Sequence, residues 1–446
     1  MNDYTGHHNR TITYDAGEYV SHPTGHALTI STVTAEQILD SRGNPTVRVS
    51  LRLDDGFEAV ASAPAGASTG AFEAVELRDG GSAYGGLGVQ GAVTAVRTEI
   101  GPLLTHHSYN TISDLDRALR DLDGTPNLAR LGANAVVAVS IAATRAFAHR
   151  AELPLHRWLS LVTGSAERMP VPHFNVLNGG AHAANALDFQ EFMIAPVQAA
   201  TEAEAVQTGA EIYHALARLI REKYAAAGLG DEGGFAPPID SAEEALDLLV
   251  AAITDAGYTP GVDSIAIAMD PAANGFSLGG GRYRLAGREL ARDELVDYYE
   301  NLVDSYPIRS IEDGFAEDDH EGWIALSERL ADRIQLVGDD LYVTDAARIL
   351  DGAHEHYSTA ALIKPNQIGT VSQTLDAIAA ARSNGMACMV SHRSGETEDT
   401  FIADLAVGTG AGQIKSGAPA RGERVAKYNR LTQIEAQNPT IPYGLA

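Results

Sequence analysis

Hydrophobic and polar residues alternate along residues 46–53, which places every second side chain from Val47 onward on one face of an extended segment. The turn-forming run DDG follows at residues 54–56, and residues 57–63 are again largely apolar. This arrangement is typical of an antiparallel hairpin with one buried face.

A helix is expected over residues 132–152, which are rich in alanine and contain few helix breakers. Strands followed by helices indicate a small α+β domain at about residues 28–160. Residues 1–27 show no clear hydrophobic period, and we expect them to form a flexible extension.

From about residue 170 the pattern changes to short apolar runs that alternate with amphipathic segments. Six of these runs end in an ionisable residue: Asp270, Glu312, Asp339, Lys364, His392 and Lys415. They lie on average about 29 residues apart, the length of one strand–helix unit. The repeat predicts parallel strands, and a charged group at every strand end favours a β/α (TIM-like) barrel, residues 161–446, over a doubly wound sheet. Helices are expected at 202–226, 291–305, 370–384 and 422–436.

Composition narrows the classes of function. The 446 residues include 32 Lys and Arg against 59 Asp and Glu, a formal net charge of −27. This balance argues against nucleic-acid binding, because phosphate backbones require clustered cations. No apolar run reaches the ~18 residues of a membrane span. The single cysteine, Cys388, excludes an intramolecular disulfide and fits a cytoplasmic location.

The six strand ends also predict a chemistry. Three carboxylates that converge at one barrel mouth need a cation, and oxygen ligands indicate Mg²⁺ rather than Zn²⁺. A lysine close to a second lysine and a divalent metal has its neutral form favoured, so it can act as a base. Arg393 and Ser394 offer a guanidinium and a hydroxyl for a phosphate or carboxylate. We therefore expect a proton-transfer enzyme that acts on a small anionic substrate.

Seven motifs occur along the chain in a fixed order. They are SRGNPT (41–46), GASTG (66–70), GDEGG (230–234), SIED (310–313), GDDL (338–341), KPNQIGT (364–370) and SHRSGETEDT (391–400). With these motifs the chain, from about residue 28 onward, resembles the enolase family. The resemblance implies a capping domain followed by a barrel, and Mg²⁺-dependent, reversible dehydration of 2-phosphoglycerate to phosphoenolpyruvate. It also implies a homodimer or a larger homo-oligomer.

The resemblance further implies metal and acid–base roles. The ligands of a first Mg²⁺ would be Asp270, Glu312 and Asp339. Ser68 would help to hold a second Mg²⁺ once substrate is bound. Lys364 would remove the proton alpha to the substrate carboxylate. Glu232, assisted by Glu191, would protonate the departing hydroxyl, and an acid held among other carboxylates is expected to have a raised pKa.

The same resemblance implies the substrate contacts. Arg393 and Ser394 would hold the phosphate, and Lys415, a catalytic residue together with His182, would hold the carboxylate. The further substrate-binding residues would be His182, Gln190, Glu191, Glu312, Asp339, Lys364 and His392.

The sequence departs from the family pattern mainly around the segment with the GASTG motif (66–70) and in the small domain. The departures are Ala65, residues 79–89, Asn274 with Gly275, and His320. They leave two alternatives open. One is a paralogue that dehydrates a phosphonate or another analogue of 2-phosphoglycerate. The other is a non-catalytic binding protein on an enolase fold.

Overall fold

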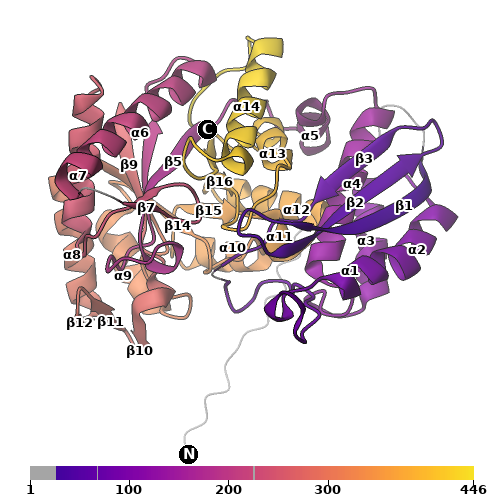
Figure 1. Cartoon of the computed structure of the whole chain (residues 1–446), viewed down its shortest axis with the longest axis horizontal. Coiled ribbons are helices and arrows are strands. Elements are labelled where there is room, and N and C mark those ends of the chain that lie inside the picture. Colours follow the sequence, from indigo (N-terminus) through magenta and orange to yellow (C-terminus); the bar gives the residue numbers. More distant parts are fainter. Residues whose placement is uncertain (1–26, 68, 225–226) are drawn as a thin grey trace, which may run out of the picture.

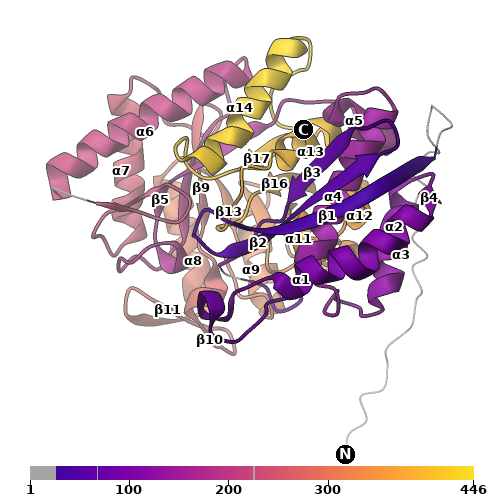
Figure 2. The ribbon, with the colours of Figure 1, turned by 45° about the vertical axis from the view of Figure 1, so that its right-hand side comes forward.

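The computed structural model describes residues 27–67, 69–224 and 227–446 (Figure 1). The expected extension, residues 1–27, lies outside these ranges except for its last residue. The described chain forms a small α+β domain and a β/α barrel that pack side by side (Figures 1 and 2).

The small domain is built on a four-stranded antiparallel sheet in the order β3-β2-β1-β4. The expected hairpin is confirmed, because β2 and β3 pair antiparallel with Val49 opposite Ala61. Val47, Val49 and Leu51 are completely buried, as their alternation predicted. The strands are β1 (Leu28–Leu39), β2 (Pro45–Leu53), β3 (Glu58–Ser62) and β4 (Ser108–Tyr109).

Helix α4 (Ala133–Arg150) lies between the sheet and the barrel and confirms the helix expected at residues 132–152. Its alanines are small enough to be buried on nearly every side, so β2 and β3 pack against it as well as α11 and α12 of the barrel. The other helical segments of this region are η1 (Ala83–Gly86), α1 (Gln90–Ala95), η2 (Val96–Ile100), α2 (Gly101–His106), α3 (Ile112–Asp123) and α5 (Leu155–Thr163).

Eight strands of the described chain close into a barrel, in which β17 pairs with β5. Each of the six expected strands forms, and each ends at its ionisable residue or one residue before it. The strands are β5 (Val171–Asn178), β6 (Glu191–Pro196), β9 (Ile265–Asp270), β13 (Ile308–Glu312), β14 (Gln335–Gly338), β15 (Ala360–Ile363), β16 (Ala387–Ser391) and β17 (Gln413–Lys415).

The barrel is mixed, because β6 runs antiparallel to both of its neighbours, β5 and β9. No long helix separates β5 from β6; the connection contains only the single turn η3 (Gly180–His182). A connection without a crossover helix favours antiparallel pairing. The start of β6 therefore lies at the same end of the barrel as the ends of the parallel strands, which brings Glu191 beside Asp270.

Helices surround the barrel (Figures 1 and 2). The four helices predicted there are confirmed. The ends differ by one residue at most, apart from the predicted end of the first helix at residue 226, which lies outside the described residues. The helices are α6 (Glu202–Tyr224), α7 (Ala242–Asp255), α8 (Arg292–Ser305), α9 (His320–Leu330), α10 (Ala346–His354), α11 (Pro365–Ile368), α12 (Val371–Ser383), α13 (Phe401–Thr409) and α14 (Gly422–Gln437). Smaller elements are β7 (Gly228–Leu229), β8 (Phe235–Ala236), η4 (Ala273–Phe276), β10 (Ser277–Gly279), β11 (Arg282–Leu285) and β12 (Arg288–Ala291).

Polar contacts join the small domain to the barrel. Arg145 of α4 forms an ion pair with Asp399 at 2.6 Å, and Ala65 forms an isolated β-bridge with Gly395. Asp116 of α3 accepts a hydrogen bond at 2.8 Å from the backbone N–H of Ser372 in the first turn of α12. Among the described residues, no helix is long and apolar enough to cross a membrane.

Candidate active site

Ten of the predicted site residues line one small cavity at the end of the barrel where the parallel strands finish. They are His182, Gln190, Glu191, Glu232, Asp270, Lys364, His392, Arg393, Ser394 and Lys415. All ten are buried. Glu312 and Asp339 lie just behind the wall of this cavity and contact its two lysines. Ser68 lies outside the described residues, so its metal-binding role stays a prediction.

The two lysines pair with the three strand-end carboxylates. The ammonium group of Lys415 donates to both oxygens of Glu312 at 2.7 Å and lies 3.4 Å from Asp270 Oδ2. Lys364 Nζ donates to Asp339 Oδ2 at 2.5 Å. These contacts show that the carboxylates face inward, where their charges must be matched by a cation.

The buried carboxylates still repel one another, and a bound divalent cation would reduce this repulsion. Burial raises the pKa of Asp270 to about 7, with a contribution from Glu191 and Asp339. Burial and Asp270 raise the pKa of Glu312 well above its usual range. Three buried carboxylate groups are the hard oxygen donors that Mg²⁺ binds, so this donor set fits the expected ion. Among the described residues, the acidic group with oxygen atoms within 4.8 Å of one another is Asp313, Asp339 and Asp340, which shares only Asp339 with the proposed ligand set.

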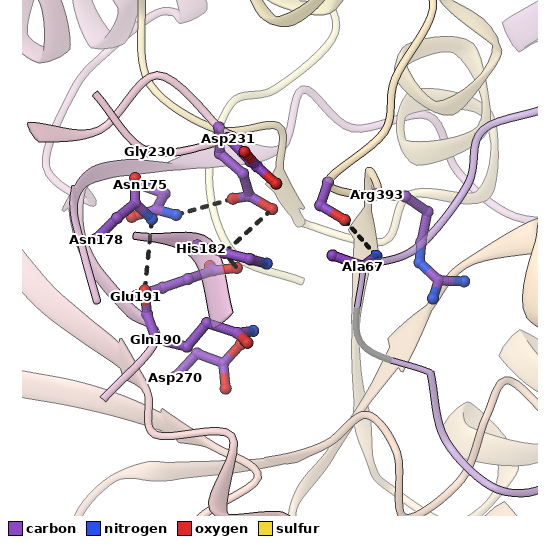
Figure 3. A network of polar contacts seen from close by, with 12 residues as sticks. Ala67, Asn175, Asn178, His182, Gln190, Glu191, Gly230, Asp231, Asp270 and Arg393 are labelled. Carbon is purple, nitrogen blue, oxygen red and sulfur yellow. Dashed lines mark hydrogen bonds and ion pairs between the residues drawn. The ribbon is translucent and has the colours of Figure 1, made fainter. Parts of the chain in front are cut away.

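His182 lies between Glu232, the predicted acid, and Glu191. His182 Nδ1 lies 3.6 Å from Glu191 Oε1 and 3.7 Å from Glu232 Oε1 (Figure 3). Glu232 Oε2 accepts a hydrogen bond from Asn175 Nδ2 at 2.8 Å and lies 3.1 Å from His392 Nε2. The histidine thus connects two buried carboxyl groups that do not have equal surroundings.

The two carboxyl groups titrate in opposite directions. Burial and Glu232 raise the pKa of Glu191 well above its usual range. Burial acts against ionisation of Glu232 as well, but His392 and His182 outweigh it and hold the pKa of Glu232 well below its usual range. The expectation of a raised pKa at Glu232 is therefore wrong for this structure. The raised pKa belongs to Glu191, where burial and the charge of Glu232 oppose ionisation.

The predicted phosphate site lies where the small domain meets the barrel. The backbone N–H of Ala67 donates to Ser394 Oγ at 2.6 Å, and Figure 3 shows Ala67 close to the strand-end loop that carries Arg393. Both terminal nitrogens of Arg393 donate to the carboxylate of Glu73, at 2.9 Å and 3.0 Å. The small domain therefore contacts both residues of the predicted phosphate site.

Two protein-family models match the chain. The model of the enolase N-terminal domain matches residues 30–159, and the model of the enolase C-terminal TIM barrel domain matches residues 166–440. The chain belongs to the enolase family. The two enolase domains carry phosphopyruvate hydratase activity, a hydro-lyase reaction that dehydrates 2-phosphoglycerate, and the family uses Mg²⁺. This confirms the predicted family, fold class and type of reaction.

The departures from the enolase pattern have structural roles away from the lining of the cavity. Ala65 exchanges two backbone hydrogen bonds, both 2.8 Å, with Gly395. Asn274 donates to Asp340 Oδ2 at 2.9 Å. His320 packs on the ring of Tyr357 with 4.7 Å between ring centroids.

Asp79, in the departing segment 79–89, accepts hydrogen bonds from the N–H groups of Gln90 and Gly91 at the start of α1. Ala65, Asn274, His320 and Asp79 thus all make local contacts in the fold.

Three residues that contact the enolase site were not singled out from the sequence. Gln367 donates to Asp339 Oδ1 at 2.9 Å and lies within the KPNQIGT motif, so its motif was a usable signal. Asn175 contacts Glu232 from inside β5, where the run of buried residues gives no local cue. Glu73 follows the GASTG motif by three residues, but it meets Arg393 only through the packing of the two domains.

Proposed function

We propose that the buried strand-end residues carry out the Mg²⁺-dependent dehydration of 2-phosphoglycerate with the roles that the enolase resemblance implies. The observation that supports this most directly is that the base, the acid pair and the anion-binding cations line one cavity. Proton removal and loss of hydroxide both require such groups within reach of one small substrate.

Lys364 is the proposed base. It lies at the end of β15 and is buried, so its ammonium group is fixed in the cavity rather than solvated. Burial opposes its charge, but Asp339 outweighs burial and raises the pKa of Lys364. The neutral, basic form is therefore populated when the Asp339 carboxylate engages another cation in place of Lys364.

Glu191 and Glu232 form the proposed acid. The raised pKa of Glu191 favours its protonated form, and His182 lies between the two carboxyl groups. A proton held on this carboxyl pair can pass through Glu232 to the departing hydroxyl, which is otherwise a poor leaving group. The contacts thereby support Glu191 as the proton reservoir and Glu232 as the group that His392 and Asn175 hold in place.

The proposed metal ligands are Asp270, Glu312 and Asp339, with Ser68 for a second ion. Bound Mg²⁺ supplies electrostatic stabilisation of the charge that builds up on the substrate carboxylate after proton removal. A lysine or histidine base with one or two Mg²⁺ ions is the general pattern of enolase-superfamily sites. Lys415 contributes a fixed positive charge beside Glu312 and Asp270. Arg393 and Ser394 bind the phosphate, and Gln190, His182 and His392 complete the substrate contacts.

A comparison of two substrates tests the proposed function against the paralogue alternative. The rate on 2-phosphoglycerate should exceed the rate on its phosphonate analogue, because the departures from the enolase pattern lie outside the lining of the cavity. A clear preference of kcat/KM for the phosphonate would contradict the proposal. Folded protein that binds Mg²⁺ and turns over neither substrate would favour the non-catalytic alternative.

A second copy of the chain is the proposed partner. The two domains meet at about residue 160, and a groove crosses their junction. Phe57 and Leu153 of the small domain line one side of the groove, and Asn429 and Gln433 of α14 line the other. Light scattering on the purified chain should give the mass of a dimer or a multiple of it, and a monomer would contradict this.

The cytoplasmic location remains a prediction from the single cysteine.

A further inference from the structure

A carboxylate of the small domain holds Arg393. Glu73 accepts hydrogen bonds from both terminal guanidinium nitrogens, at 2.9 Å and 3.0 Å. The side chains of Glu73 and Arg393 are only 8% and 3% exposed, so solvent ions screen the pair weakly. A two-point contact between planar groups fixes the orientation of the guanidinium as well as its position.

The backbone on both sides of Glu73 is itself attached to the barrel. The N–H of Ala71 donates to the carboxylate of Glu317 at 3.2 Å. The N–H of Ala74 donates to the carbonyl oxygen of Gln367 at 2.7 Å. Glu73 is therefore a fixed anchor, and Arg393 adopts the orientation that this anchor sets.

The carboxylate of Asp339 also attracts Arg393 electrostatically. Burial opposes the charge of Arg393, but Glu73 and Asp339 outweigh it and raise its pKa. Asp339 already accepts hydrogen bonds from Lys364 and Gln367. If Glu73 lost its charge, Arg393 would be drawn toward Asp339, the proposed metal ligand.

We propose that Glu73 is the positioning residue of the phosphoryl subsite: it clamps one edge of the Arg393 guanidinium, directs the group toward the substrate phosphoryl and keeps it away from Asp339. The inference rests on the proposed function, in which Arg393 binds the phosphoryl group. Glu73 acts through Arg393 and not on the substrate.

The variant Glu73→Gln tests this proposal, with Glu76→Gln as the matched control. Glu76 lies on the same segment and loses the same charge, but its carboxylate pairs with Arg78 at 2.7 Å. At saturating Mg²⁺, Glu73→Gln should raise the KM for 2-phosphoglycerate at least about tenfold and change kcat less, because a charge-assisted pair is lost from the binding site. Inorganic phosphate should also inhibit this variant more weakly than the wild type. The control should change both values by a smaller factor, because the Glu76 charge also acts on Arg393 but its carboxylate is paired with Arg78.

The outcomes separate a positioning role from a merely structural one. A lower thermal midpoint with an unchanged KM and unchanged phosphate inhibition would overturn the proposal, as would equal effects of Glu73→Gln and Glu76→Gln. If Glu73→Gln does not fold, Glu73→Asp replaces it. This variant keeps the charge on a shorter side chain and should raise KM by an intermediate factor. An unchanged KM would overturn the proposal. A wild type that does not turn over 2-phosphoglycerate would refute the proposed function instead.

Discussion

Each ionisable side chain of the site would be costly to bury alone. Lys415 is tolerated because Glu312, Asp270 and Glu191 all lie within 3.4 Å of its ammonium group. Removing one member of such a group leaves an unmatched buried charge, which destabilises a protein more than the loss of one contact suggests. The chemistry at each residue is therefore set by its neighbours.

Replacing the base should abolish turnover. Lys364→Ala is expected to lower kcat by about 10³-fold or more, since a positioned general base contributes that order of acceleration. The chain should still fold, but with lower stability because Asp339 loses its buried partner. Mg²⁺ binding should persist, because the carboxylates stay in place. Rate assays, circular dichroism and metal titration measure these quantities. Lys223→Ala, at an exposed lysine, is the control; retained activity in Lys364→Ala would refute the base assignment.

Replacing a metal ligand should weaken Mg²⁺ binding. Asp339→Ala is expected to raise the Mg²⁺ dissociation constant at least tenfold, about 1.4 kcal/mol, because one of three carboxylate donors is lost. Asp340→Asn removes the neighbouring charge, outside the proposed ligand set, and should have a smaller effect. If Asp340→Asn weakened binding more than Asp339→Ala, the ion would belong to the group formed by Asp313, Asp339 and Asp340.

At the scale of elements, what the sequence could predict depends on how each strand is buried. The hairpin at β2 and β3 was visible because one face is buried and alternation shows it. Strands β5 and β6 are buried on both faces throughout. Their apolar runs therefore do not indicate whether the two strands pair parallel or antiparallel. The ends of six strands were predictable from their ionisable residues, whereas the reversal of β6 depends on the missing crossover helix.

A buried contact between two helices predicts a pH-dependent stability. Burial raises the pKa of Asp116 to about 6 from 3.8, although the N–H of Ser372 acts to lower it. Above pH 6 the folded protein therefore holds an unfavourable buried charge. As the pH falls from about 6 to 4, the folded protein takes up a proton before the unfolded chain does, and that cost disappears.

Asp116→Asn, which is always neutral, should consequently gain stability relative to the wild type as the pH rises from 4 to 8, by up to about 3 kcal/mol. Urea unfolding at several pH values measures this difference. Asp121→Asn, at an exposed position of the same helix α3, should show no such trend. A stability difference that is constant with pH would contradict the proposed cost of burying Asp116.

At the scale of the whole molecule, the site is complete only because two domains meet. Ala67 and Glu73 come from the small domain and contact Ser394 and Arg393 of the barrel. The barrel half of the site could be predicted, because repeating strand ends place its residues at one rim. The contact from Glu73 could not, since 320 residues separate it from Arg393 and no local pattern records how the domains dock.

The central claim is that this cavity dehydrates 2-phosphoglycerate with Mg²⁺. The most direct measurement is the rise in ultraviolet absorbance when the purified chain is mixed with 2-phosphoglycerate, with and without Mg²⁺, because the enol product is conjugated. We predict rapid formation of product that depends on Mg²⁺. Folded protein that binds Mg²⁺ and forms no product, or product formation that is unaffected by removal of Mg²⁺, would contradict the account.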